Sequence, residues 1–466
     1  MRTAASPKRF VSLPSDIAVQ VQQLISRRLG LAFTEGRQAD LTQGFTRACR
    51  SSPVPTFSDY LAWLEELPDD NPEWRRLAAY LTVGETHFFR DSACFDALER
   101  HVLPNLLEAR RREGVLRLRI WSAACSTGEE PYSLAMVLDR LLPDRARWVI
   151  TLLATDISSR ALEAAHRGRY RDWSFRETPA WIRQRYFRGR GDGTVEVDPP
   201  IRAMVTLAAL NLATDSYPSP VTNTGAMDLI LCRNVLMYFT RAMQQATVAR
   251  LQRALVPGGW LIVSPAEASA ELFRPLVPVN FPGAIFYRKG QELVDPSGAT
   301  SLAEAGFSEF AAPLREACLP ARSSPLERRE KIEPDPAADL EQARALADQG
   351  QLEQAQKLCT TLLSRDRLNV DAYLLFAAIA HERGELRAAH HAAHRALYLA
   401  PDSAIAHYLM GSVLFRQGHR RRGRKSMETV VTLLRGVPRD TALPGGDGLS
   451  AGRLLEMART YLEFGE

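Results

Sequence analysis

The sequence lacks any paired arrangement of cysteines. Its six cysteines are scattered along the chain: Cys49, Cys94, Cys125, Cys232, Cys318 and Cys359. None forms a C-x-x-C pair, so neither a disulfide framework nor a zinc ribbon is indicated. We therefore expect a reduced, cytoplasmic protein that holds no metal ion.

Long apolar runs and a strong charge of one sign are also missing. No stretch approaches the ~20 apolar residues that a membrane helix needs, and the N-terminus does not resemble a secretory signal. The net charge is only +5 over 466 residues, which is too little to argue for nucleic-acid binding. With 45% apolar and 24% charged residues, the composition is that of a soluble globular protein. We expect neither membrane insertion nor a nucleic-acid partner.

The first 290 residues contain two successive patterns of apolar residues. Residues 15–110 carry apolar side chains at three- and four-residue steps, which predicts an N-terminal helical domain. From residue 116 onwards, short apolar strands alternate with helical segments, which predicts a parallel sheet covered by helices on both faces. This α/β domain is expected to span residues 111–289. The expected strands are 116–121, 148–155, 227–232, 260–264 and 284–288.

An insert, a linker and a repeat complete the organisation. Residues 168–208 interrupt the alternation with short β-like runs, at 194–197 and 205–207, and predict a small antiparallel insert. Residues 290–335 are rich in Pro, Ala, Ser, Glu and Arg and lack periodicity, as linkers do.

A repeat follows the linker, over residues 336–466. Gly350, Gly384 and Gly418 lie 34 residues apart, the period of the tetratricopeptide repeat (TPR). Two repeats are clear, and the third departs at Arg420 and Gly423 and is expected to be modified. Residues 449–464 would form the capping helix that stacked repeats need.

The loop between the first strand and its helix is the first segment that carries chemistry. Residues 122–128 are small, a geometry suited to a nucleoside or dinucleotide. They do not form G-x-G-x-x-G, and Glu129 and Glu130 stand where a pyrophosphate would bind. Two carboxylates repel phosphate but suit S-adenosylmethionine, which carries a sulfonium and an ammonium and no phosphate. The alternative is that the pair only complements the helix dipole.

A carboxylate closes the second expected strand. Asp156 stands where an acidic residue typically accepts hydrogen bonds from ribose hydroxyls. It could equally begin the next helix as an N-cap, and both interpretations stay open.

Five segments in order make a family resemblance specific. They are Gly84-Glu-Thr-His-Phe-Phe-Arg-Asp91, the run from Trp121 to Ala135, Ala154-Thr-Asp-Ile157, Asn211-Leu212, and Cys232-Arg-Asn-Val-Leu-Met-Tyr-Phe239. Over residues 15–289 the chain resembles the CheR family, which methylates glutamates of chemotaxis receptors with S-adenosylmethionine. The repeat region resembles the TPR-fused, Wsp-type branch. The resemblance implies a class I, Rossmann-like methyltransferase fold with a small β insert, between a helical domain and a TPR domain.

The resemblance also implies site residues. The implied cofactor contacts are Thr86, Arg90, Glu130, Asp156, Asn211, Leu212, Cys232 and Arg233. Arg90 and Tyr238 match positions that line the methyl-acceptor site, and Asn234 is expected to shape the same cleft. Gly84 stands where the family usually has Asn, so one cofactor contact is expected to be missing.

The implied function is O-methylation of receptor glutamates, leaving glutamate methyl esters and S-adenosylhomocysteine. The implied partner is the cytoplasmic domain of a chemoreceptor, with a further protein on the repeats. Two other functions stay open: a catalytically weak adaptor that acts through its repeats, and a methyltransferase of a non-receptor protein. Family members that tether to a receptor's C-terminal pentapeptide resemble one another in a longer glycine loop of the insert. Gly189-Arg-Gly-Asp-Gly193 is shorter, which predicts that the tether is not needed here.

Overall fold

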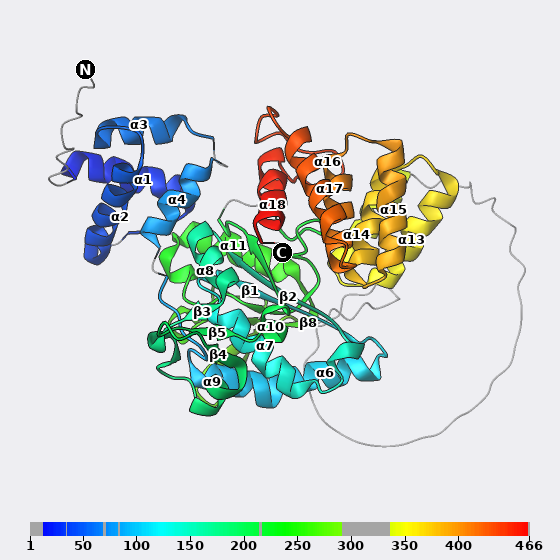
Figure 1. The fold of residues 1–466 in the computed structure, drawn as a ribbon, viewed down its shortest axis with the longest axis horizontal. Helices are drawn as coiled ribbons and strands as arrows, with labels where there is room; N and C mark the ends of the chain where they lie inside the picture. The colour runs from blue at the N-terminus through cyan, green and yellow to red at the C-terminus, as the bar shows by residue number, and fades with distance from the viewer. Residues whose placement is uncertain are drawn as a thin grey trace, which may run out of the picture.

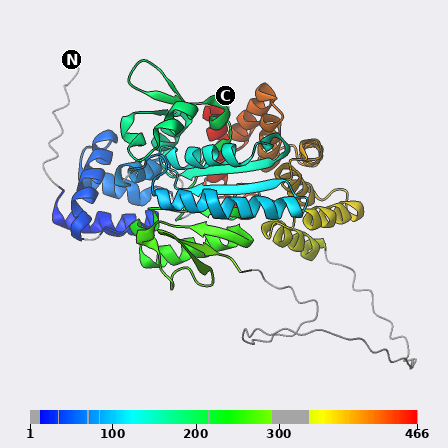
Figure 2. The same ribbon diagram turned by 90° about the horizontal axis from the view of Figure 1, so that it is seen from below.

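A computed structural model describes residues 13–33, 35–68, 71–82, 84–213, 217–290 and 336–464. A central sheet is flanked by helices, with the N-terminal helices at one end and the C-terminal helices at the other (Figures 1 and 2). The expected linker at 290–335 lies outside the described residues, apart from its first position. Among the described helices, none has the length and hydropathy needed to cross a bilayer.

Seven strands form the central sheet, in the order β6-β2-β1-β7-β8-β10-β9. They are β1 (Arg117–Ala123), β2 (Val149–Asp156), β6 (Val205–Ala209), β7 (Met227–Leu231), β8 (Leu255–Ile262), β9 (Val277–Phe281) and β10 (Ala284–Arg288). The five strands from β6 to β8 pair in parallel, and β10 pairs antiparallel with both β8 and β9. This confirms the predicted α/β class. β9 was not among the expected strands, and its side chains are mostly exposed.

Helices cover both faces of the sheet. They are α5 (Ser92–Ala97), α6 (Leu103–Arg112), α7 (Glu129–Leu141), α8 (Ser159–Arg167) and α11 (Arg241–Ala254), with a π-helical turn at Leu98–Val102 joining α5 to α6. One apolar cluster joins α5, α6 and α7 to one face of the sheet through Leu118 and Ile120. Two helices that begin before residue 110, α5 and α6, thus pack on the sheet, and the expected domain limit at that residue stays a prediction.

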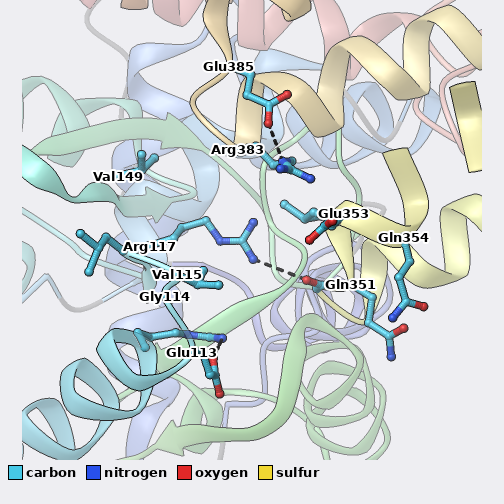
Figure 3. A pocket seen from close by; sticks show the side chains of 14 residues that line it. Glu113, Gly114, Val115, Arg117, Val149, Gln351, Glu353, Gln354, Arg383 and Glu385 are labelled. Carbon is cyan, nitrogen blue, oxygen red and sulfur yellow. Dashed lines mark hydrogen bonds and ion pairs between the residues drawn. The ribbon is translucent and has the colours of Figure 1, made fainter. Parts of the chain in front are cut away.

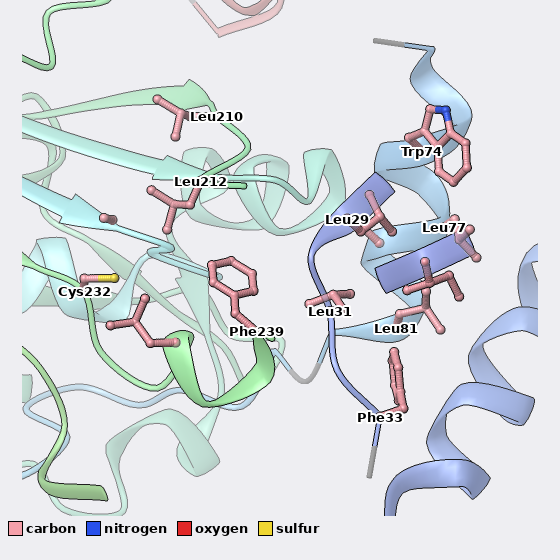
Figure 4. Packing of buried hydrophobic residues seen from close by; sticks show 14 of the residues in the cluster. Leu29, Leu31, Phe33, Trp74, Leu77, Leu81, Leu210, Leu212, Cys232 and Phe239 are labelled. Carbon is pink, nitrogen blue, oxygen red and sulfur yellow. The ribbon is translucent and has the colours of Figure 1, made fainter. Parts of the chain in front are cut away.

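The N-terminal helices pack at the carboxyl edge of the parallel strands. They are α1 (Ser15–Leu29), α2 (Gln38–Ser51), α3 (Phe57–Glu66) and α4 (Pro72–Leu81). Their apolar side chains join a second cluster with Leu212, Cys232 and Phe239, and Figure 4 shows Leu31 between the helices and Phe239. Leu31 also forms a β-bridge with Phe239. The helical domain therefore borders the edge where βαβ folds place their ligands.

The insert forms a separate three-stranded antiparallel sheet, in the order β3-β5-β4. Its elements are β3 (Arg169–Tyr170), α9 (Ala180–Tyr186), β4 (Phe187–Gly189), β5 (Val195–Val197) and α10 (Pro199–Arg202). One part of the prediction was wrong. Residues 205–207 belong to β6, which pairs in parallel with β2 in the large sheet. A five-residue strand alone does not reveal its partner.

The repeat region consists of three helical pairs and a final helix. They are α12 (Pro336–Asp348), α13 (Leu352–Arg365), α14 (Val370–Glu382), α15 (Leu386–Leu399), α16 (Ala404–Arg416), α17 (Arg420–Leu433) and α18 (Ala451–Phe464). Gly350, Gly384 and Gly418 each turn the chain within a pair, at φ between 77° and 79°. The third unit keeps this form, and its helices cross closely at Gly411 and Gly423. These helices fit a TPR-like domain.

The TPR-like domain closes the amino edge of the sheet. Arg119 of β1 is 1% exposed, and its Nε lies 3.2 Å from Glu382 of α14. A cleft of about 600 Å³ lies between the two domains, lined on one side by Arg117 and Val149 and on the other by Gly350 and Arg383. In Figure 3, Arg117 reaches into the cleft and donates to the Gly350 carbonyl at 3.5 Å. Since a buried guanidinium needs compensating partners, the two domains depend on one another here.

A titratable carboxyl at this interface makes stability depend on pH. Asp348 ends α12 and faces the Gly225 loop of the α/β domain. Burial, reinforced by the carboxylates of Asp447 and Glu382, raises its pKa from 3.8 to about 6. The native state therefore binds this proton more tightly than the unfolded chain, and the contribution to stability is lost as the pH rises through 4 to 6.

The substitution Asp348→Asn removes the titrating carboxyl and therefore the loss of stability between pH 4 and pH 6. We expect the variant to be more stable than the wild type by roughly 3 kcal/mol at pH 7, with the difference vanishing towards pH 4. Chemical denaturation at several pH values measures this. Asp402→Asn, an exposed position, is the control and should leave the profile unchanged. An Asp348→Asn profile parallel to that of the wild type would contradict the assignment.

Candidate active site

The carboxyl ends of β1, β2, β6 and β7 meet at one edge, where the expected site residues gather. The chain leaves β1 through the small-residue loop and begins α7 at Glu129. Gly128 has φ 96°, and a Cβ there would lie 2.8 Å from Ala165. The loop lies so close to α8 that a side chain at this position would collide with the helix, and the positive φ also favours glycine.

Asp156 holds this loop in place. Its Oδ2 accepts from the Ser126 backbone N–H and its Oδ1 from that of Ser158, both at 2.8 Å. Burial raises its pKa, and the backbone donors oppose that rise. Ser158, not Asp156, is the N-cap of α8. Asp156 therefore joins two backbone segments at the sheet edge, and a bond to ribose remains a prediction.

The two glutamates at the start of α7 have different environments. Glu129 is buried, accepts from Thr127 at 2.6 Å and Ser174 at 3.0 Å, and burial raises its pKa. Glu130 faces the site, where it accepts from Ser122 at 2.7 Å and from Arg233 at 3.2 Å. Glu129 thus holds the loop to the insert, whereas Glu130 is tied to the end of β1 and to Arg233, and its contact with a ligand stays a prediction.

Arg233 connects three segments of the site. Its side chain is 3% exposed and pairs with Glu130 and with Asp91, each at 3.2 Å. It also donates to the carbonyl of Arg90 at 2.9 Å. Burial disfavours its charge, but the surrounding acidic groups outweigh that effect and raise its pKa. Arg233 therefore fixes the segment around Arg90 against α7 and the end of β7.

The Arg90 side chain is held through the backbone. Its Nη1 donates to the carbonyl of Glu85 at 2.7 Å. In the part of the chain that the structure describes, no carboxylate pairs with it, because Asp91 is taken by Arg233. Thr86 is half-buried in the same segment, and the Gly84 carbonyl accepts from Ser126 at 3.1 Å. The segment that carries Gly84, Thr86 and Arg90 thus lies against the loop after β1.

Asn211, Leu212 and Cys232 lie at the ends of β6 and β7. Asn211 follows Leu210, whose N–H donates to the Asp156 carbonyl at 3.0 Å. Leu212 and Cys232 belong to the buried apolar cluster (Figure 4), and burial raises the pKa of the Cys232 thiol. Any contact these two make with a ligand would be through the backbone or an apolar edge.

Tyr238 lies in the loop that follows β7, next to the helical domain. Its carbonyl accepts from Ala32 at 2.7 Å, and the Arg37 guanidinium lies 4.6 Å from its ring centroid. Sequence reasoning missed Arg37 as a neighbour of Tyr238. It also missed Glu267, whose carboxylate accepts from this loop. The signal for Glu267 was Ser264-Pro-Ala-Glu267, the pattern of a capping box.

The comparisons with known proteins agree with this geometry. Residues 84–274 match the family described as "CheR methyltransferase, SAM binding domain". "Chemotaxis protein methyltransferase 1" of Pseudomonas aeruginosa is 39% identical over 213 residues, which are 45% of this chain and 74% of that protein. "Chemotaxis protein methyltransferase" of Escherichia coli is 36% identical over 259 residues, which are 55% and 85% of the two chains. The chain belongs to the CheR methyltransferase family.

A third relative also spans the C-terminal region of this CheR-family chain. "Probable biofilm formation methyltransferase WspC" of P. aeruginosa is 26% identical over 431 residues, which are 90% of this chain and 99% of that protein. Membership identifies S-adenosylmethionine as the cofactor. The residues present fit it, since Glu130 and Asp156 offer carboxylates to an ammonium and to hydroxyls where a phosphate would be repelled.

The substitution Asp156→Ala tests whether Asp156, which holds the loop after β1, contributes to cofactor binding. We expect binding of S-adenosylhomocysteine to weaken by ~1–3 kcal/mol, since hydrogen bonds to a charged acceptor are lost and the loop is released. Isothermal calorimetry measures the affinity, and circular dichroism checks the fold. Asp172→Ala, an exposed aspartate of the insert, should bind normally. Unchanged affinity of a folded Asp156→Ala protein would remove Asp156 from the site.

Proposed function

We propose that this CheR-family protein methylates glutamate side chains on the cytoplasmic domain of a chemoreceptor, as a protein-glutamate O-methyltransferase. The observation that carries the proposal is the arrangement around Arg233, which holds Arg90 with no carboxylate partner in the described chain. Arg90 shares its edge of the sheet with Glu130 and Asp156. Chemotaxis methyltransferases among the relatives support the reaction type.

The chemistry requires no general base from the protein. A substrate glutamate has an unperturbed pKa near ~4.3 and is already ionised at neutral pH. S-adenosylmethionine supplies, when bound, a methyl group on a cationic sulfur. Transfer of that methyl group to the carboxylate would cancel two opposite charges and leave a neutral ester and a neutral thioether. Catalysis then depends on positioning and on exclusion of water.

We assign Arg90 and Tyr238 to the positioning of the methyl-accepting carboxylate. Arg90 can orient the incoming carboxylate with a charge-assisted hydrogen bond, since its fixed contact is to the carbonyl of Glu85. A very tight pair would reduce the reactivity of the carboxylate, so we assign Arg90 orientation rather than activation. Tyr238 is proposed to line the other side of the acceptor site, from the loop after β7, where the Arg37 guanidinium lies against its ring.

Two substitutions test these roles. Arg90→Ala should lower methyl transfer about 10- to 100-fold, and Tyr238→Phe about 3- to 10-fold, the cost of one charged and one neutral hydrogen bond. Unfolding free energies should change by less than ~1 kcal/mol. Transfer of labelled methyl groups to a cognate receptor, scored as base-labile esters, measures the rates. Arg100→Ala, an exposed arginine of the π-helical turn, is the control, and wild-type turnover in both site variants would refute the assignment.

Two rival functions have distinct outcomes in the same assay. An adaptor that works through its repeats would bind the cofactor without methylating any receptor, and Gly84 in place of Asn is the feature that favours it. A methyltransferase of another protein would leave receptors unlabelled but label a different substrate. The contacts of Arg233 with Glu130, Asp91 and the Arg90 carbonyl support an active enzyme.

Recruitment is proposed to occur in the cytoplasm, without the pentapeptide tether. The β4–β5 hairpin is short, with Arg190 and Thr194 closing its tip at 3.1 Å, and β4 offers an edge of only three residues. Arg47 and Arg50 are exposed on α2 and can face an acidic receptor helix. Arg37, which precedes α2, lies against the Tyr238 ring instead. The TPR-like domain would hold a further protein partner.

Truncating the receptor tests this mode of recruitment. Methylation of a cognate receptor should proceed at the same rate, within about 2-fold, with and without its last five residues, because the edge that would bind them is too short to add a stable strand. Initial rates at limiting receptor concentration measure the effect. A tether-dependent CheR relative assayed on its own receptor pair is the positive control. A large loss of rate on truncation would contradict the prediction.

A further inference from the structure

One carboxylate accepts most of the backbone donors of the loop that carries Tyr238. Glu267 ends the 3₁₀ turn η6 (Pro265–Glu267), which follows β8. Its Oε2 accepts from the Asn234 N–H at 2.7 Å, and its Oε1 accepts from Val235 at 2.7 Å and Met237 at 3.2 Å. These three amides come from four consecutive residues, so they converge on a single anion.

The same carboxylate is also bound from its own side. The Ser264 backbone N–H donates to Oε2 at 3.1 Å and the Ser264 hydroxyl at 2.6 Å. Glu267 is 8% exposed, so water does not compete freely for these bonds. A buried carboxylate that accepts five hydrogen bonds is well compensated, and its position is fixed relative to β8.

The loop has a shape that needs such support. Asn234 has φ 57°, a left-handed conformation that costs free energy outside glycine and is tolerated best by Asn and Asp. This conformation aims successive N–H groups towards one side, as in an anion-binding nest. Without an acceptor, three amides at a half-buried site would lose their partners, at a cost that a short loop cannot recover internally.

The opposite side of the loop is tied to the helical domain. The Ala32 N–H donates to the Tyr238 carbonyl at 2.7 Å, and the Thr240 N–H donates to the Gly30 carbonyl at 3.0 Å. The loop is thus clamped between residues 30–32 and Glu267, with Arg233 at its start and Tyr238 near its end.

We propose that Glu267 is a positioning residue for methyl transfer, which holds the Asn234–Tyr238 loop in the shape that places Tyr238 at the acceptor cleft. This inference rests on the proposed function for its catalytic part. Glu267 acts through the loop and does not itself touch the reacting atoms.

A carboxylate is required here rather than an amide of the same shape. Both oxygens of Glu267 face only N–H and O–H donors. In Glu267→Gln, one oxygen becomes an NH₂ group, which would point donors at donors on one side of the cluster. The substitution preserves volume and therefore tests the hydrogen bonds and not the packing.

The experiment compares Glu267→Gln with Glu271→Gln in the full-length chain. Glu271 lies four residues on, is exposed, and pairs only with the exposed Arg241 in the described chain, so its variant should behave as the wild type. Hydrogen–deuterium exchange at residues 232–239, affinity for S-adenosylhomocysteine, and kcat on a cognate receptor are measured for each protein.

For Glu267→Gln we expect faster exchange confined to residues 232–239 and kcat lowered at least ~10-fold, while the dissociation constant for the product changes less than ~3-fold. A purely structural role would instead raise exchange across β7 and β8 and weaken cofactor binding in parallel. That outcome, or unchanged exchange at 234–237, would overturn the proposal.

A second variant covers the case in which Glu267→Gln does not fold. Ser264→Ala removes one donor from the carboxylate and leaves the loop contacts in place, so it should lower kcat by about 2- to 5-fold with intact product binding. Wild-type turnover in Ser264→Ala together with an unfolded Glu267→Gln would reject positioning in favour of stability. If the wild-type enzyme labels no receptor, the proposed substrate is wrong, and local exchange in Glu267→Gln then decides the loop's dependence on Glu267 alone.

Discussion

A buried positive charge organises the active site. The Arg233 guanidinium follows β7, is 3% exposed, and must find anionic and carbonyl partners where water cannot serve. Those partners come from Asp91, from Glu130 at the start of α7, and from the Arg90 carbonyl. Three segments that are far apart in the sequence are therefore held at one edge of the sheet. Removing the guanidinium would release the Arg90 segment and leave Glu130 with only Ser122 among these partners.

A buried arginine also needs partners at the opposite, amino edge of the sheet, and there its partners join two domains. Arg119 lies on β1, the strand that leads to the loop at residues 122–128. Its guanidinium donates to the carbonyls of Gly225 and Asn223 and pairs with Glu382 of the TPR-like domain. Asp228 of β7 accepts from the Arg119 N–H at 2.8 Å and pairs with Arg110 of α6. Charges at the carboxyl edge thus hold the segments of the candidate site together, whereas those at the amino edge fasten a second domain. The repeats are part of the folded body of this enzyme.

The sequence could predict features that have a local pattern, and it could not predict features that depend on contacts between distant segments. The parallel strands, the start of α7 at Glu129 and the 34-residue spacing of the glycines are local patterns, and the structure agrees with them. Residues 205–207 were assigned to the wrong sheet because pairing with β2 is a tertiary property. Arg37 and Glu267 were missed for a similar reason: each reaches the Tyr238 loop from a distant segment. The separate environments of Glu129 and Glu130 also depend on Ser174 of the insert and on Arg233, which adjacency in sequence does not reveal.

The placement of the domains restricts how a partner on the repeats can influence catalysis. The helical domain borders the Tyr238 loop at the carboxyl edge, while α12 and α14 contact the amino edge. A protein bound to the repeats near the amino edge is therefore separated from the acceptor cleft by the length of the strands. One direct route between the helical domains exists, because Glu456 of α18 pairs with Arg75 of α4. That carboxylate is buried and also contacts Arg439 and Arg453, so a shift of α18 would act on α4. Since α4 packs with Leu31 in the cluster that includes Phe239, the contact between α18 and α4 is connected to the loop that carries Tyr238 by apolar packing.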